Sequence, residues 1–187
     1  MKSIKSRPLI QGEKVLLRPM RVDEMPLFYE WATRSDSTSY WYEDGNIPTQ
    51  EQFRKDWKIH YFDGSEPEKG RCYAIVAEGR PVGQVNYNEI NRGNSSVELD
   101  IIIASDSDKN KGYGSEALSM LVEYLFRNMR IRKCWIEPTA RTARAVKAYE
   151  KAGFRITHKF LSGGTECVHM ELSASENGRP IVRNEAS

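Results

Sequence analysis

The segment DKNKGYGSEAL, residues 108–118, places Gly112 and Gly114 two positions apart, after an apolar run and before a helical pattern. Glycines allow a ligand to approach the backbone closely, and the N–H groups and positive dipole end of a helix start favour an anion such as phosphate. Lys109 and Lys111 would add mobile positive charge at the rim. The segment has neither the Gly-Lys-Ser/Thr of a Walker A loop nor the third glycine of a dinucleotide-binding motif. Taken alone, it fits either an anion-binding loop or an ordinary turn with solvated lysines.

Two carboxylates precede this loop in the segment SVELDIIIA, residues 96–104. In a strand, alternation places Glu98, Asp100 and Ile102 on one face, with the two carboxylates about 7 Å apart. The continuous apolar end predicts a strand buried on both faces. Asp100 is our first candidate for accepting a proton from a reacting group, and Glu98 is the second. The alternative is that both carboxylates only form ion pairs with neighbouring basic residues.

Size and charge limit the possible partners. The 187 residues suit one domain with its own hydrophobic core, and a net charge of +2, from 28 basic and 26 acidic residues, gives no reason to expect a nucleic-acid partner. No segment approaches the length of a membrane span, and the N-terminus MKSIKSRPLIQGEK lacks an apolar signal core. We therefore expect a cytoplasmic protein that does not bind membranes.

The cysteines and histidines are scattered along the chain. An odd number of distant cysteines predicts reduced, buried thiols, and scattered histidines give no reason to expect a metal site. These residues are Cys72, Cys134, Cys167, His60, His158 and His169.

Hydrophobic patterning predicts a mixed α/β domain with one sheet. Strands are expected at 13–20, 72–78, 82–90, 96–104, 133–138, 154–161 and 166–172. Helices are expected after Asp23, from a capping box of Thr49 and Gln52, from Gly114, and over 142–153. The second of these helices would carry Phe53, Trp57 and Tyr61 on one side. We assign residues 1–172 to the domain and 173–187 to a polar C-terminal tail.

The glycine loop, the strand after it and the helical segment RAVKAYEKAGF together resemble the GNAT superfamily of acyl-CoA-dependent N-acetyltransferases. The family's pyrophosphate loop, Arg/Gln-x-x-Gly-x-Gly/Ala, is matched by Lys109-x-x-Gly112-x-Gly114, with lysine at the first position. Thr142 stands where the family usually has asparagine, and the family's tyrosine is retained as Tyr149. The segment VLLRPMRVDEMPLFYEW resembles the family's first strand and helix, so the resemblance covers most of the chain.

This resemblance implies a GNAT fold, in which a mixed, mostly antiparallel sheet splays between its fourth and fifth strands and is flanked by about four helices. It also implies acetyl-CoA as co-substrate and direct attack of an amine on the acetyl group. Tyr149 would protonate the CoA thiolate; its alternative role is that of a buried aromatic. The implied cofactor contacts are Ile101, Ile102, Ile103, Lys109, Asn110, Lys111, Gly112, Tyr113, Gly114, Ser115 and Thr142.

The acceptor side resembles two subfamilies that act on small polycations. The segment FYEWATRSDSTSYWYEDG is similar to aminoglycoside 6'-N-acetyltransferases, while SYWYE and EINRGNSSVELDIIIA are similar to spermidine N-acetyltransferases. Aromatic faces and carboxylates together suit an ammonium-rich ligand. The candidate substrate-binding residues are Tyr40, Trp41, Glu43, Asp44, Glu137 and Glu166.

Other interpretations remain open from the sequence. The aromatic and acidic loop could be a hydrophobic plug under a solvated turn. The enzyme could instead acetylate protein N-termini, or the chain could be a CoA-binding module without turnover. A homodimer is also compatible with the sequence.

Overall fold

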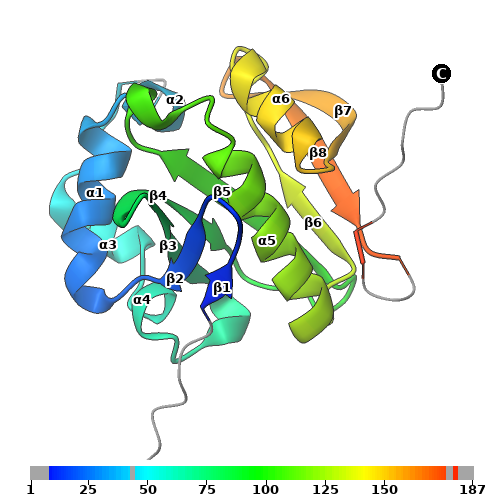
Figure 1. The fold of residues 1–187 in the computed structure, drawn as a ribbon. Coiled ribbons are helices and arrows are strands. Elements are labelled where there is room, and N and C mark those ends of the chain that lie inside the picture. The colour runs from blue at the N-terminus through cyan, green and yellow to red at the C-terminus, as the bar shows by residue number, and fades with distance from the viewer. Residues whose placement is uncertain (1–8, 43–44, 176–178, 181–187) are drawn as a thin grey trace, which may run out of the picture.

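The computed structural model describes residues 9–42, 45–175 and 179–180, and these form one eight-stranded sheet covered by helices (Figure 1). The strand order is β1-β2-β3-β4-β5-β6-β8-β7, antiparallel throughout except for the parallel pair β5 and β6. The predicted mixed, mostly antiparallel sheet is confirmed. The strands are β1 (Ile10–Gln11), β2 (Leu16–Pro19), β3 (Arg71–Ala77), β4 (Arg80–Tyr87), β5 (Ser96–Ile103), β6 (Lys133–Ile136), β7 (Arg155–Ser162) and β8 (Thr165–Ser173).

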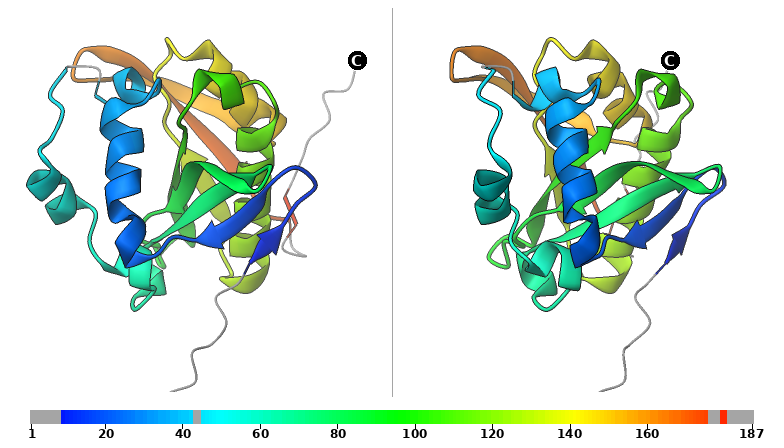
Figure 2. Two further views of the ribbon diagram at one scale, coloured as in Figure 1. Left: turned by 60° about the vertical axis from the view of Figure 1, so that its left-hand side comes forward. Right: turned by 90° about the vertical axis from the view of Figure 1, so that its left-hand side faces the viewer.

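Helices cover both faces of the sheet. Figure 2 shows α1 and α5 on opposite sides of the central strands, and α6 packs beside α5. The one-turn helix α2 lies within the aromatic and acidic segment that the sequence analysis describes as a loop. The helices of the described part are α1 (Met25–Arg34), α2 (Thr38–Trp41), α3 (Gln50–Asp56), α4 (His60–Asp63), α5 (Tyr113–Asn128) and α6 (Ala143–Lys151).

The capping box before α3 is confirmed, but the helix after it is shorter than predicted. The Thr49 hydroxyl accepts from the N–H of Gln52, and the Gln52 side chain accepts from the N–H of Thr49. The helix ends at Asp56, and a second one, α4, begins at His60. The single helix predicted through Tyr61 is therefore wrong. The break lets Trp57 stack on Trp41, a tertiary contact that helical spacing alone does not encode.

Strand β5 has buried residues on both faces, but its apolar end is less buried than predicted, because Ile101 and Ile103 are partly exposed and line the opening beside the strand. Val97 and Leu99 belong to the core beneath α5, where apolar residues of that helix recur at helical spacing. Ile102 faces the second core, which α1, α3 and α4 cover with aromatic side chains. The three cysteines are buried, as predicted.

The sheet opens between β5 and β6, the fourth and fifth of the predicted strands. Their parallel pairing covers only Ser96–Glu98, whereas β5 runs on to Ile103. Beyond Ile136 the chain turns toward β8 instead, because the carbonyl of Pro138 accepts from the N–H of Val168 and Ala140 donates to the carbonyl of Glu166. The far half of β5 is therefore left with a β4 partner on one side and an opening on the other.

The last strand of the sheet ends close to the predicted boundary between the domain, residues 1–172, and the C-terminal tail. Strand β8 reaches Ser173, and Ala174 forms a bridge with Pro180. The division at 172/173 stays a prediction. In the part of the chain that the structure describes, every helix is too short or too polar to cross a membrane.

Candidate functional site

A groove of about 1010 Å³ occupies the opening between β5 and β6. Its walls come from β5, the loop before α5, the segment after β6, and α6, and Trp41 and Trp57 also line it. Most of the residues proposed from sequence meet here. Those that line the groove are Trp41, Glu98, Asp100, Ile101, Ile102, Ile103, Lys109, Asn110, Gly112, Gly114, Ser115, Glu137, Thr142 and Tyr149.

At one end of the groove, the glycine loop leads into α5. Asn110 and Gly112 both have positive φ, 64° and 88°, so the loop turns sharply before the helix. The first N–H groups of α5 have no partner within the helix and face the anion-favouring end of its dipole. A Cβ on Gly114 would lie 3.6 Å from Ile101 Cδ1 and Ile103 Cγ1, an ordinary contact, so the fold itself does not require glycine there.

The two loop lysines are not mobile charges, contrary to our expectation. Lys109 is almost completely buried, and its Nζ lies 2.6 Å from Asp106 Oδ1 and 3.3 Å from the carbonyl oxygen of Asp36. Lys111 Nζ lies 3.5 Å from Asp108 Oδ1, a carboxylate that Arg80 also binds through both oxygens. The ion pair with Asp106 and the hydrogen bond to the backbone of Asp36 fix the Lys109 side chain, so Lys109 connects the glycine loop to the segment that follows α1.

Positive charge on the groove wall comes instead from the opposite side, at and before α6. Arg141, Arg144, Lys147 and Lys151 all line the groove. Sequence reasoning missed them because a charged helix face normally signals only solvent exposure. They face the glycine loop across the groove and suit the phosphate-rich end of a ligand.

Several proposed residues lie elsewhere. Tyr113 is buried and donates from its hydroxyl to Glu78, 2.9 Å away. Glu166 is exposed and pairs with Lys159. Tyr113, Glu166 and Lys111 do not line the groove. The side chain of Tyr40, and all of Glu43 and Asp44, lie outside the described part of the chain.

The other end of the groove holds the two carboxylates of β5. An amide on the segment after β4 bridges them: Asn88 Nδ2 donates to Glu98 Oε2 at 3.1 Å and to Asp100 Oδ2 at 2.9 Å. Asn86 Nδ2 donates to Asp100 at 3.2 Å, and Tyr61 donates to Asn88 Oδ1 at 3.1 Å. The two asparagines are functional candidates that the sequence did not reveal. Their contact with the carboxylates depends on the pairing of β4 with β5, which the sequence alone does not show.

Burial makes both carboxylates reluctant to ionise. Desolvation, followed by the charge of Asp100, raises the pKa of Glu98 to about 7. Desolvation also raises the pKa of Asp100, and the hydrogen bonds from Asn88 and Asn86 oppose that rise. The pair therefore carries a proton that it can give up or take near neutral pH, the property a general base needs.

Tyr149 lies on α6 and lines the groove. Desolvation, with a smaller effect from the charge of Asp100, raises the pKa of its hydroxyl, so the group stays protonated at neutral pH. Thr142, at the start of the same helix, donates its hydroxyl to the carbonyl of Thr139 at 2.7 Å, which leaves its oxygen lone pairs for a ligand. This side of the groove thus offers a proton donor and an acceptor.

Aromatic rings flank the carboxylate end. Trp41 and Trp57 stack with ring centroids 6.0 Å apart, and Phe28 packs edge-on against both. Trp57 was predicted only as part of a buried helix face. Tryptophan faces beside Glu98, Asp100 and Glu137 form a site suited to a cationic amine.

A sheet that opens between β5 and β6, a glycine loop before a helix and a groove lined by two carboxylates are the features expected of an acyl-CoA-dependent acetyltransferase. The chain belongs to the GNAT acetyltransferase family: the family model described as "Acetyltransferase (GNAT) domain" matches residues 14–155. The fold and family predicted from the sequence are both confirmed.

Named relatives fall into the two predicted subfamilies. The chain is 27% identical over 153 residues to an aminoglycoside N(6')-acetyltransferase type 1 of Klebsiella pneumoniae, covering 76% of this chain and 75% of the relative. It is 24% identical over 160 residues to the spermidine N(1)-acetyltransferase of Escherichia coli K12, covering 82% and 81%. Among solved structures, AAC(6')-Ib with ribostamycin and coenzyme A has the same fold, with a TM-score of 0.73 at 24% identity over 93% of this chain and 100% of that one.

Proposed function

We propose that the protein transfers an acetyl group from acetyl-CoA to a primary amine of a small polycation, of the aminoglycoside or polyamine kind. The observation that carries this proposal is the groove itself, which joins the glycine loop before α5 to a pair of half-buried carboxylates and is also lined by two tryptophans. The names of the relatives at 27% and 24% identity support the same acceptor class.

Each part of acetyl-CoA would have its own set of contacts in the groove. The N–H groups at the start of α5 would hold the pyrophosphate, and the basic residues at α6 would face the nucleotide phosphates. The edge of β5 beyond Glu98, where strand β6 has already diverged, would hydrogen-bond the pantetheine arm; at its far end the carbonyl of Ile103 accepts from the Ser37 hydroxyl. The acetyl group would then lie beside Asp100 and Tyr149.

The reaction would take place where the acetyl group of the cofactor meets the acceptor amine, beside Asp100 and Tyr149. An acceptor amine arrives as an ammonium ion and must lose a proton before it attacks the acetyl carbonyl. Glu98 and Asp100, bridged by Asn88, would take that proton. Tyr149, kept protonated by burial, would donate to the CoA thiolate as it leaves. The attacking nitrogen would lose its second proton as the amide forms, and that proton would restore the Tyr149 hydroxyl. Holding both reactants in one groove supplies the remaining rate enhancement.

The acceptor class is tested by measuring CoA release from acetyl-CoA with three groups of amines: aminoglycosides, polyamines and N-terminal peptides. We expect turnover with one of the first two groups and background rates with the peptides. Turnover confined to peptides would replace the proposed acceptor with a protein N-terminus. Tight CoA binding with background rates for every amine would identify a CoA-binding module instead of an enzyme.

A further inference from the structure

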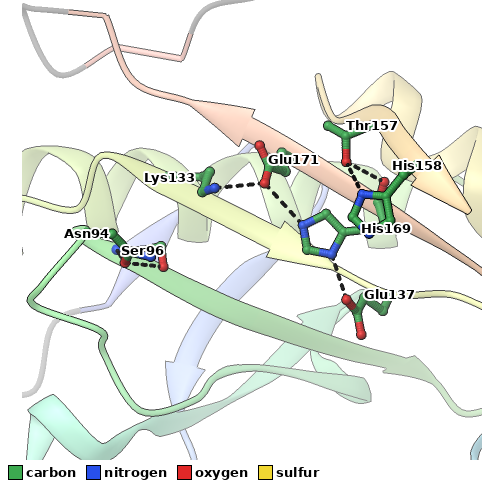
Figure 3. Close-up of polar contacts among 8 residues, drawn as sticks. All are labelled: Asn94, Ser96, Lys133, Glu137, Thr157, His158, His169 and Glu171. Carbon is green, nitrogen blue, oxygen red and sulfur yellow. Dashed lines mark hydrogen bonds and ion pairs between the residues drawn. The ribbon is translucent and has the colours of Figure 1, made fainter. Parts of the chain in front are cut away.

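The two walls of the groove are held in different ways near the β5 carboxylates. Glu137, on the wall that follows β6, belongs to a row of side chains across β6 and β8 (Figure 3). Its Oε1 lies 2.6 Å from His169 Nδ1. His169 Nε2 lies 3.1 Å from Glu171 Oε1, and Lys133 Nζ contacts that same oxygen at 2.8 Å. Because β6 and β8 are paired strands of the sheet, this wall is fixed by the fold itself.

Trp41, on the other wall, belongs to the one-turn helix α2. This helix spans only Thr38–Trp41, and the N–H of Tyr42 donates to the carbonyl of Thr38 at 2.9 Å. So short a helix is not stable by itself, because fixing the first turn costs more free energy than one hydrogen bond returns. Contacts with the rest of the protein must therefore hold α2 in place.

At the C-terminal end of α2 these contacts are aromatic. Trp41 stacks on Trp57 with ring centroids 6.0 Å apart, and it meets Phe28 edge-on at 5.9 Å. No polar group fixes the position of Trp41 in these two contacts. The orientation of the helix is therefore set mainly from its other end.

The residues just before α2 are bonded to the cofactor side of the groove. The Ser37 hydroxyl donates to the carbonyl of Ile103 at 2.7 Å. Asp36 Oδ2 accepts from the N–H of Asp106 at 2.7 Å, and the carbonyl of Asp36 accepts from Lys109 Nζ at 3.3 Å. These partners run from the end of β5 to the first residue of the glycine loop. Movement or ordering of that segment is thus passed on to α2.

Ser37 and Trp41 lie four positions apart, and both line the groove. Ser37 has helical backbone angles, φ −102° and ψ −5°, so the two side chains lie on the same side of one helical turn. The Ser37 hydroxyl gives its hydrogen to Ile103, which leaves its oxygen lone pairs to accept from a ligand N–H. One turn of chain can therefore touch the pantetheine arm at Ser37 and the acceptor amine at Trp41.

We propose that residues 36–41, the connector, couple cofactor binding to acceptor binding. Ser37 accepts from an amide N–H of the pantetheine arm as the arm passes Ile103, and Trp41 faces the acceptor amine. Either ligand orders the short helix, so the second ligand binds to a connector that is already ordered. Asp36 does not line the groove and is a positioning residue, which acts by holding the connector to the segment before the glycine loop. This inference rests on the proposed function and adds a coupling between its two substrates.

The test measures the dissociation constant of CoA by calorimetry, alone and with a saturating amine. CoA carries no acetyl group, so no transfer takes place during the titration. Kanamycin, an aminoglycoside, and spermidine, a polyamine, are the two amine probes. In the wild type we expect the amine that supports transfer to lower the dissociation constant of CoA about tenfold, within the usual range for coupled sites.

Asp36→Ala should separate coupling from direct binding. We expect its dissociation constant for CoA alone to stay within about twofold of the wild type, while the effect of the amine falls below about twofold. Asp36→Asn should restore the effect of the amine, because the amide oxygen can still accept from the N–H of Asp106. Ser37→Ala should lose the coupling and also bind CoA alone about fivefold more weakly, the loss expected for one hydrogen bond.

Ser96→Ala is the matched control for Ser37→Ala. Ser96 is also a buried serine, and its hydroxyl donates to Asn94 Oδ1 at 2.6 Å (Figure 3). It lies at the start of β5 and does not line the groove. Its dissociation constant for CoA, with and without the amine, should equal that of the wild type.

Several outcomes would overturn the inference. A tenfold effect of the amine that persists in Asp36→Ala or Ser37→Ala rejects the connector, since attraction between the cationic amine and the anionic cofactor would then account for the coupling. An Asp36→Asn variant that behaves as Asp36→Ala rejects the bond to Asp106 as the link. If Asp36→Ala fails to fold, Ser37→Ala decides by the same criterion. Transfer to an amine that leaves the affinity for CoA unchanged in the wild type rejects this inference but keeps the proposed function, whereas no transfer to any amine rejects both.

Discussion

The two ends of the groove are built in different ways. The end at α5 is made from one short stretch of chain, with the backbone of residues 109–115 folded by positive φ angles at Asn110 and Gly112. The end at β5 is assembled from side chains of β4, β5 and β6 and from Trp41, Trp57 and Tyr61, with Asn88 joining two carboxylates. The backbone site depends on a few glycines, whereas the side-chain site depends on contacts between distant segments of the chain. A substitution at one end should therefore impair that end and leave the other intact.

The largest effect is expected from Asp100→Asn. Removing a general base costs roughly 10²–10⁴ in rate. We expect kcat to fall at least about a hundredfold while the dissociation constant for CoA changes less than about threefold, because the α5 end is untouched. Steady-state kinetics and calorimetric CoA titration measure the two quantities. A parallel loss of CoA affinity would show that the two ends are not separable.

Gly114→Ala should damage the opposite end alone. A methyl group there meets Ile101 and Ile103 at ordinary distances but occupies space in the groove beside the helix start. We expect CoA affinity to fall about tenfold, and thermal stability to stay level or rise, because alanine in a helix is more favourable than glycine by about 0.5–1 kcal/mol.

Gly93→Ala serves as the matched control for this variant, since Gly93 lies outside the groove. Its CoA affinity should equal that of the wild type. Unchanged CoA affinity in Gly114→Ala would remove the loop from cofactor binding. Gly112 is less informative, because its φ of 88° strains any side chain whether or not a ligand binds there.

The same contrast explains how far the sequence could be interpreted. The loop was predictable because its chemistry lies within seven consecutive residues, and the strand carrying Glu98 and Asp100 was predictable from its alternation. Asn88 and Asn86 were not, because their role depends on the register of β4 against β5. The basic groove residues at α6 and the Trp41–Trp57 stack likewise depend on how distant segments fold together. Sequence patterns report local structure, and this acceptor end is not local.

Asn88→Ala should show how much the bridge matters. Its hydrogen bonds favour the ionised forms of both carboxylates, so removing them raises both pKa values further. The acid limb of the pH–rate profile should then move upward by about one unit, with kcat at pH 7 about fivefold lower and kcat at pH 9 almost unchanged. Asn94→Ala, a turn residue that bonds Ser96, is the control. An unmoved acid limb in Asn88→Ala would mean that the bridge does not tune the base.

The last prediction concerns the free energy of unfolding, which should depend on pH through Glu98 at the β5 end but not through the glycine loop at the α5 end. The folded protein raises the pKa of Glu98 to about 7 from an ordinary 4.5, so the folded state holds this proton more tightly than the unfolded chain does. The stability that follows is present below pH 4.5 and is lost as the pH rises through 7. Glu98→Gln has no such titrating group. Denaturant titrations should therefore show that its free energy of unfolding, relative to the wild type, is about 2 kcal/mol more favourable at pH 8 than at pH 5.

Gly114→Ala is the control: its free energy of unfolding should differ from that of the wild type by the same amount at both pH values, because no titrating group changes there. A Glu98→Gln stability difference that does not vary with pH would mean that this carboxylate ionises freely in the fold, and the proton-accepting role would then rest on Asp100 alone.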